Sequence, residues 1–573
     1  MRIALAAVAL VACTRSTAPK PSLISTGERS NYVRTGRYDE AVRLCHDFQR
    51  AYVGVRCDEI GHTVEDRPVL ALRIAKRAGL PTIYIQAGIH AGEIEGKDAG
   101  FAFLRDLLDG KVAPGALDAV SVVFVPVVNP DGHERFGPNN RVNQRGPEEM
   151  GFRTNAARLN LNRDFVKVDT PEMQAVVDEL HRSDPVLLMD LHTTDGAKFE
   201  HDLSIVTAPF APRPDRLEET ARALSAQLMK RLTELGHLPI PFYPAFIDDD
   251  NPASGFAHGE APPRFSTYYM PARGRLGMLV ETHSWRTYKE RATSTYHTLQ
   301  TVFEDATRNA RTWRAVCDEA SRSDVALAGT PVTLMWDHAK TSREIAFRGY
   351  AYTKTKSEIS DGEWIVYDEN TPQIWNVPYF DELVPAQTIT APRAGYIVDG
   401  GHAPAVAKLL TTHGIAYAPV IAKRLDVEAF RATAVKYAPG PFEGRTRATI
   451  TGAWATETRM LDRGAIYIPI EQPTARLIMH LFEPTLPDSL AQWGHFNAVF
   501  ERKEYMESYV AEQVARDMLA ADPALRGAFD AALAADPEMA KNPRKRLEFF
   551  HRRHASWDER VDLLPVYRVQ VAP

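Results

Sequence analysis

Ionisable side chains stand where several apolar, strand-like runs of this sequence end. Three runs lead to four residues able to bind a metal or move a proton: 82–88 to His90 and Glu93, 186–191 to His192, and 276–280 to Glu281. In an open α/β sheet, ligands bind beside the carboxyl ends of the strands. The pattern therefore predicts that two imidazoles and two carboxylates converge on one edge of a sheet.

Such a group of side chains has the chemistry of a catalytic zinc site. Neutral imidazole nitrogens and carboxylate oxygens are ligands of Zn²⁺, and three protein ligands leave one coordination position open for water. A further carboxylate beside the ion can move a proton as a general base. The residue types alone leave open which three of the four would bind the metal.

Sequence context separates one His-x-x-Glu pair from two others, because such a short pair is a weak signal by itself. The three pairs are His62/Glu65, His90/Glu93 and His480/Glu483. The first lies in a polar, hairpin-like stretch. The last lies in or beside the apolar run 477–482; if that run is a strand, residues three apart face opposite sides and cannot bind one ion. The middle pair follows a strand through Ala91 and Gly92, where the chain can turn.

The elements expected to position these residues indicate an α/β fold. From about residue 38 to residue 320, apolar strands alternate with helical patterns. We expect helices at 93–108, 171–180 and 217–235. A boundary is expected near 321–330, followed by strands and turns with one strand–helix–strand unit. This second region, 321–573, is predicted to be an α+β domain of unknown role. Its His402 and His413 are expected at the surface or in turns.

Composition excludes several classes of protein. The 573 residues are 44% hydrophobic and 25% charged, with a net charge of −6, as in soluble globular proteins. The absence of a basic excess argues against nucleic acid as a partner. The length predicts two or three domains.

The first residues resemble a bacterial lipoprotein signal. An apolar run at 3–12 ends before Cys13, too short for a membrane-spanning helix. We expect a signal peptide at 1–12, a lipid anchor at Cys13 as the only membrane attachment, and a tether at 13–36. The alternatives to a lipoprotein signal are an ordinary secretory signal and the start of a buried helix. Export would place the protein in the periplasm or on a membrane, where Cys45 and Cys57 could pair and Cys317 would stay free.

Five motifs together resemble the zinc carboxypeptidase family of metallopeptidases. They are HAGE (90–93), NPDG (129–132), RTNAARLNLNRDF (153–165), DLHT (190–193) and VETH (280–283). Their order and relative spacing also agree, and the resemblance covers about residues 39–318. It implies a zinc peptidase domain at 37–320, built on a mixed twisted sheet with helices on both faces.

The resemblance also implies a role for each site residue. His90, Glu93 and His192 would hold one Zn²⁺ ion, with the two-histidine, one-glutamate ligand set of carboxypeptidase A, a member of this family. Glu281 would be the general base and Arg153 would stabilise the oxyanion. The remaining pair, Asn162 and Arg163, would bind the carboxylate at the end of a peptide substrate, which a guanidinium fork matches.

Alternatives remain for several of these positions. Arg153 is chosen by its spacing of nine residues from Asn162 over its neighbours Arg141, Arg145 and Arg158. Arg163 could instead pair with Asp164 or Glu172 in a structural network.

The sequence also departs from the family pattern. Asn160 occupies a position where the family commonly has an aspartate that orients the first zinc histidine, which weakens the charge behind that ligand. No tyrosine that closes over substrate is assigned, although Tyr268 and Tyr269 are candidates.

The leading hypothesis is an exported zinc carboxypeptidase that removes C-terminal residues from peptides. A zinc-dependent amidase or deacylase acting on N-acyl amino acids or cell-wall peptides is the second hypothesis, and a non-catalytic binding lipoprotein is the third. The sequence specifies neither the substrate side chain nor the oligomeric state.

Overall fold

A mixed eight-stranded sheet forms the centre of the amino-terminal part of the protein. The computed structural model describes residues 22–194, 196–249, 251–461 and 463–573. The strand order is β1-β2-β4-β3-β5-β9-β6-β7. The strands β4, β3, β5 and β9 run parallel, whereas β1, β2 and β6 join antiparallel. The bounds are β1 (Val55–His62), β2 (Pro68–Ile74), β3 (Thr82–Ala87), β4 (Ser121–Val125), β5 (Leu187–Thr193), β6 (Leu203–Ala208), β7 (Pro239–Ile240) and β9 (Leu276–Thr282).

Helices cover both faces of this sheet, because the strands are apolar on both sides. On β3, Ile83 and Ile85 face one core while Tyr84 faces the other, as strand alternation requires. The first core is covered by α2 (Tyr38–Ala51), α3 (Glu95–Leu108), α7 (Leu217–Glu234) and α9 (Tyr288–Val325). The second is covered by α6 (Pro171–Ser183) and α8 (Ser266–Tyr269). The expected fold class, a mixed α/β sheet between helices, is confirmed.

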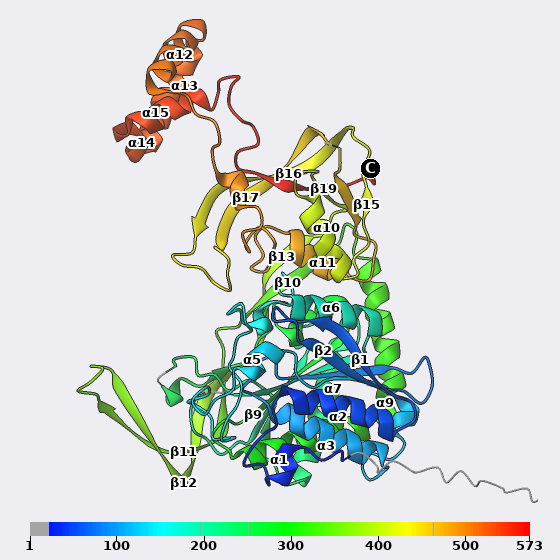
Figure 1. The fold of residues 1–573 in the computed structure, drawn as a ribbon. Helices are drawn as coiled ribbons and strands as arrows, with labels where there is room; N and C mark the ends of the chain where they lie inside the picture. Colours follow the sequence, from blue (N-terminus) through cyan, green and yellow to red (C-terminus); the bar gives the residue numbers. More distant parts are fainter. Residues whose placement is uncertain (1–21, 195, 250, 462) are drawn as a thin grey trace, which may run out of the picture.

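Further sheets follow in the carboxyl-terminal part, as the α+β expectation required (Figure 1). A six-stranded sheet has the order β15-β18-β14-β19-β16-β17. Its strands and neighbouring helices are β14 (Gly395–Val398), α10 (Ala403–Thr412), β15 (Ala418–Pro419), β16 (Arg424–Tyr437), β17 (Ala448–Met460), β18 (Ile466–Pro469), α11 (Ala475–Phe482) and β19 (Leu563–Val569). Smaller sheets are formed by β10 (Pro331–His338) with β13 (Leu383–Thr390), and by β11 (Arg343–Lys356) with β12 (Glu363–Phe380) and β8 (Phe256–Ala257).

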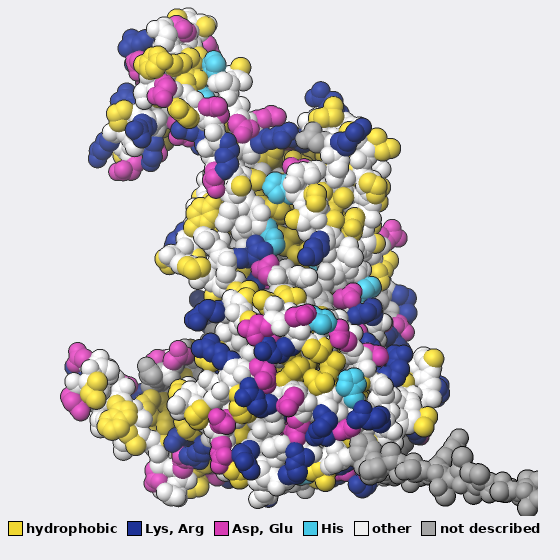
Figure 2. Space-filling model, viewed as in Figure 1, with side chains coloured by type: hydrophobic (Ala, Val, Ile, Leu, Met, Phe, Trp, Pro, Cys, Tyr) yellow, Lys and Arg dark blue, Asp and Glu magenta, His cyan; other side chains and the backbone are white. Residues whose placement is uncertain are grey.

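Four helices project from the carboxyl-terminal part as a separate lobe (Figures 1 and 2). They are α12 (Ser508–Ala521), α13 (Ala524–Ala535), α14 (Pro537–Lys541) and α15 (Pro543–His551). Phe529, Phe549 and Phe550 form the centre of a small core of their own. The remaining short helices are α1 (Thr26–Arg29), α4 (Ala116–Ala119) and α5 (Pro130–Glu134), with 3₁₀ turns at Leu161–Arg163, Pro252–Ser254, Pro271–Arg273 and Asn497–Phe500.

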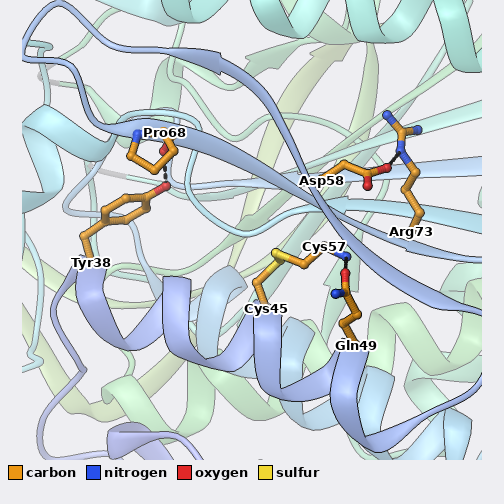
Figure 3. Close-up of a disulfide and its surroundings, with 7 residues drawn as sticks. All are labelled: Tyr38, Cys45, Gln49, Cys57, Asp58, Pro68 and Arg73. Carbon is orange, nitrogen blue, oxygen red and sulfur yellow. Dashed lines mark hydrogen bonds and ion pairs between the residues drawn. A yellow bond between two sulfur atoms is a disulfide. The ribbon is translucent and has the colours of Figure 1, made fainter.

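A disulfide joins α2 to β1, as expected from the cysteines (Figure 3). Cys45 and Cys57 lie 12 residues apart with their Cα atoms 5.4 Å apart. Gln49 on the same helix accepts a 2.7 Å hydrogen bond from the backbone N–H of Cys57. Cys317 is free and buried. The middle of the helix and the edge strand are therefore joined to each other covalently.

The structure corrects two sequence expectations and adds to a third. The third helix begins at Glu95, so Glu93 lies in the preceding turn, where its N–H donates to the carbonyl of His90. The run 477–482, for which a strand was one interpretation, is part of helix α11, so strand alternation does not separate His480 from Glu483; the Glu483 carboxylate pairs with Arg568 instead. His413 lies in the turn that ends α10, as expected, but its side chain is fully buried.

The proposed signal peptide, Cys13 and residues 13–21 of the tether lie outside the described residues. The rest of the expected tether, residues 22–36, is folded against the domain instead: it contains α1, Ser25 is buried, and the buried hydroxyl of Thr35 donates a 2.8 Å hydrogen bond to Asp98. Among the helices that the structure does describe, none has the length and apolar character needed to cross a bilayer.

Candidate functional site

Three of the sequence-predicted residues meet at the carboxyl edge of the central sheet. His90 and Glu93 follow β3, and His192 lies near the end of the adjacent parallel strand β5. The Nδ1 atoms of His90 and His192 each lie 3.0 Å from a different oxygen of Glu93. One ligand atom from each residue can be chosen so that all lie within 4.8 Å of one another. All three side chains are buried, so this group could hold one metal ion.

The turn after β3 creates this arrangement. Gly88 has φ +62°, a conformation that glycine adopts without the steric cost other residues pay. The chain then turns through Ala91 and Gly92, and a Cβ at Gly92 would lie 2.7 Å from the carbonyl of Gly151. This close backbone packing fixes the loop, so that both ends of the HAGE motif face His192.

A polar group lies behind the imidazole of each histidine. The Nε2 of His90 lies 3.1 Å from Oδ1 of Asn160, and the Nε2 of His192 lies 3.0 Å from Oδ2 of Asp190. The acceptor Asn160 holds a proton on Nε2 of His90 and leaves its Nδ1 facing Glu93, as metal-ligating histidines require, whereas Asp190 places a negative charge beside Nε2 of His192. Sequence reasoning missed Asp190, although a residue two before His192 on one strand shares its face.

The charges in the group also fit a bound cation. Burial lowers the pKa of His90 to about 4, so this imidazole is neutral at pH 7. Burial opposes a charge on His192, yet Asp190 and Glu93 outweigh it and raise the pKa of that imidazole well above its usual value. The surroundings of the His192 ring therefore favour a positive charge, which either a proton or a bound cation can carry.

Glu281 lies beside this group on the neighbouring strand. β5 and β9 run parallel, and His192 is paired in register with Glu281. Residues in register on adjacent strands point to the same face. The Glu281 side chain is buried, and its charge contributes to the raised pKa of His192. The structure therefore brings a second carboxylate to the edge where the His90–Glu93–His192 group lies.

Two arginines reach Glu93, one of them predicted from the sequence. Nη1 of Arg153 lies 3.6 Å from Oε1 of Glu93, whereas Nη2 of Arg141 lies 2.8 Å from the same oxygen. The Arg141 side chain is nearly buried and that of Arg153 is 35% exposed. Arg141 thus neutralises Glu93 from within the protein, while Arg153 is accessible to solvent. Another alternative, Arg145, instead pairs with Glu369.

The predicted carboxylate-binding pair lies in a 3₁₀ turn that Asn160 caps. The guanidinium of Arg163 lies over the ring of Phe265 at 4.4 Å and donates to the carbonyl of Asn162 at 2.8 Å. Asp164 is instead bound to Lys167 at 2.6 Å. Burial and the nearby charge of Arg153 lower the pKa of Arg163. An anion bound beside Arg163 would therefore compensate the positive charges of both Arg163 and Arg153.

Neither tyrosine considered from the sequence faces the site. The hydroxyl of Tyr268 donates to the carbonyl of Gly259, and that of Tyr269 bonds to His413. Tyr243 lies close enough to Arg163 to influence its pKa. No sequence motif marks Tyr243, which lies in a loop between β7 and β8.

The buried His–Glu–His group at the carboxyl edge of this mixed sheet, with another carboxylate beside it, is the arrangement expected of a metal-dependent hydrolase. A family model described as zinc carboxypeptidase matches residues 42–360. The chain therefore belongs to the zinc carboxypeptidase family, which confirms the resemblance of its motifs, and it is a zinc metallopeptidase. Zinc is the metal of this family, and His90, Glu93 and His192 are residues that could bind it.

Solved structures show a partial similarity. A metallo-carboxypeptidase from Pseudomonas aeruginosa is 20% identical, with 47% of this chain and 69% of that chain covered and a TM-score of 0.35. A metallo-carboxypeptidase from Burkholderia cenocepacia is 19% identical (44% and 64% covered, TM-score 0.33). Carboxypeptidase A from Helicoverpa armigera is 15% identical (48% and 74% covered, TM-score 0.37). No curated protein matches the sequence.

Proposed function

We propose that this protein is an exopeptidase that removes residues from the carboxyl end of peptides. The observation that carries the proposal is the buried His90–Glu93–His192 group with Glu281 in register beside it. Zinc, when bound, lowers the pKa of a water molecule and polarises the scissile carbonyl. The rest of the chemistry falls to side chains of this chain.

Each further residue has a task that its position supports. The buried carboxylate of Glu281 would take the proton from the attacking water and pass it to the leaving amine. Arg153, partly exposed beside Glu93, would stabilise the oxyanion. Asn162 and Arg163 would bind the terminal carboxylate of the substrate, for which the guanidinium fork is suited. This last contact would restrict cleavage to the chain end.

A pair of peptides tests this proposal. One carries a free carboxyl terminus and the other the same sequence with a terminal amide, and mass spectrometry reports the products. We expect the wild-type protein to shorten only the free peptide by one residue, with loss of activity on chelation and recovery with Zn²⁺. Arg163→Ala should raise KM for the free peptide. Equal cleavage of both peptides would contradict exopeptidase action and favour the amidase alternative.

We further propose that the protein is exported and attached to a membrane through a lipid at Cys13. The Cys45–Cys57 disulfide supports an oxidising compartment, because such bonds are rare in the cytosol. Replacement of Cys13 by serine should release the protein from the membrane fraction. Equal membrane association of both forms would contradict the lipid anchor.

A further inference from the structure

A tight turn of the carboxyl-terminal sheet reaches the segment that carries the predicted substrate-binding residues. Phe442 and Arg445 close the hairpin between β16 and β17 with two backbone hydrogen bonds. The two residues between them have positive φ, +49° for Glu443 and +76° for Gly444. A two-residue turn of this kind favours Asn-Gly or Asp-Gly. A glutamate at the first position is unfavourable for the turn itself, which points to a task for its side chain.

Contacts on both sides hold this turn against residues 159–169. Oε2 of Glu443 accepts a 2.7 Å hydrogen bond from the backbone N–H of Asn160. Arg445 forms a two-pronged ion pair with Asp169. A Cβ at Gly444 would lie 3.2 Å from Leu159. The position of Glu443 is therefore fixed relative to Asn160.

Asn160 in turn connects this contact to a predicted metal ligand. Its Oδ1 accepts hydrogen bonds from the Nε2–H of His90 and from the backbone N–H of Asn162, both at 3.1 Å. Only two hydrogen bonds therefore separate the carboxylate of Glu443 from the imidazole of His90.

We propose that Glu443 is a positioning residue of the metal centre, which fixes Asn160 and, through it, the ring of His90. The inference rests on the metal site of the proposed function. It assigns to the carboxyl-terminal part a task at the active site: this part supplies a group that supports a zinc ligand more than 350 residues earlier in the sequence. The relay requires both the reach and the acceptor oxygen of the glutamate side chain.

Zinc affinity of the full-length protein, measured by competition with a chelator, tests this role. Glu443→Asn creates an Asn-Gly turn, which suits the positive φ values, but its shorter side chain does not reach Asn160. We expect about tenfold weaker zinc binding, the lower end of the range for residues behind a metal ligand, with no loss in the midpoint of thermal unfolding. Glu443→Gln keeps the reach and an acceptor oxygen, so its zinc affinity should change by much less than about tenfold.

Two controls separate positioning from general stability. Glu457→Gln removes a carboxylate from the same hairpin, where it pairs with Arg431, and should leave zinc affinity unchanged. In an Asn160→Ala background, Glu443→Asn should have no further effect, because the relay is already interrupted. Wild-type zinc affinity in the Glu443→Asn variant would overturn the inference, as would equal losses in both backgrounds. A zinc-loaded wild-type protein without peptidase activity would contradict the proposed function alone.

Discussion

At the scale of single residues, the proposed general base is Glu281. It is buried in register with His192, and a glutamine there has nearly the same shape but cannot accept a proton. We expect Glu281→Gln to lower kcat by about 10³-fold, within the range for loss of a general base, while one zinc ion per chain is retained. Steady-state kinetics and metal analysis of the same preparation measure both quantities.

A matched variant completes this comparison. Glu358 lies at the exposed tip of the β11–β12 hairpin, so Glu358→Gln should leave both turnover and zinc content unchanged. Wild-type turnover in Glu281→Gln would contradict the assignment of the base.

Single residues also show how far sequence reasoning reached. His90, Glu93, His192 and Glu281 could be placed together because each lies at or just beyond the carboxyl end of an apolar strand, and these ends share one edge of a parallel sheet. Their catalytic roles stay predictions. Sequence spacing did not show that Arg141 also reaches Glu93, because the path of the long loop after β4 has no periodic pattern.

At the scale of elements, a disulfide links a helix covalently to an edge strand of the central sheet. It joins the middle of α2 to the edge strand β1, and neither element carries a residue of the metal group (Figure 3). Replacing Cys45 and Cys57 by serine should lower the free energy of unfolding by about 2–3 kcal/mol, because a short loop in the unfolded chain is no longer closed. Denaturant titration of oxidised wild-type and variant protein measures this difference.

Activity of the folded serine variant should equal that of wild type. Unchanged stability would show that the disulfide adds nothing to the fold, and reduced activity under native conditions would show a role for α2 at the site.

Elements with a regular apolar pattern could be predicted, and ambiguous ones could not. The strands at β3, β5 and β9 and the helix at α7 follow clear periodicity. The run 477–482 is apolar and short, so strand and helix were equally compatible with it; the helix forms with Arg476 and His480 buried beside their apolar neighbours. Burial of polar side chains through partners on distant segments is not visible in a local pattern.

At the scale of the whole molecule, the two halves of the chain share one core. Val176 and Val177 of α6 belong to the same buried cluster as Ile466 and Ile468 of β18. The buried His413 bonds through one ring nitrogen to the hydroxyl of Tyr269 and through the other to the carbonyl of Val166. A division of the chain at residue 320 stays a prediction, and these contacts indicate that the halves fold together.

Truncation after residue 326 is therefore expected to destroy the peptidase. The shortened chain would expose the apolar side chains of α6 that pack against the carboxyl-terminal part, and such exposed patches promote aggregation. Size-exclusion chromatography and circular dichroism should show aggregated or unfolded material. A soluble, monomeric fragment with full activity and zinc affinity would contradict a shared core and the positioning role of Glu443.

The central claim is that His90, Glu93 and His192 hold one zinc ion, and metal analysis of the purified full-length protein tests it most directly. Inductively coupled plasma mass spectrometry, after incubation with zinc and removal of the excess, should find one zinc ion per chain in wild type and in Glu358→Gln. It should find almost none in a His90→Ala, His192→Ala double variant that retains its circular dichroism spectrum. A full zinc complement in that double variant, or no zinc in wild type, would contradict the account.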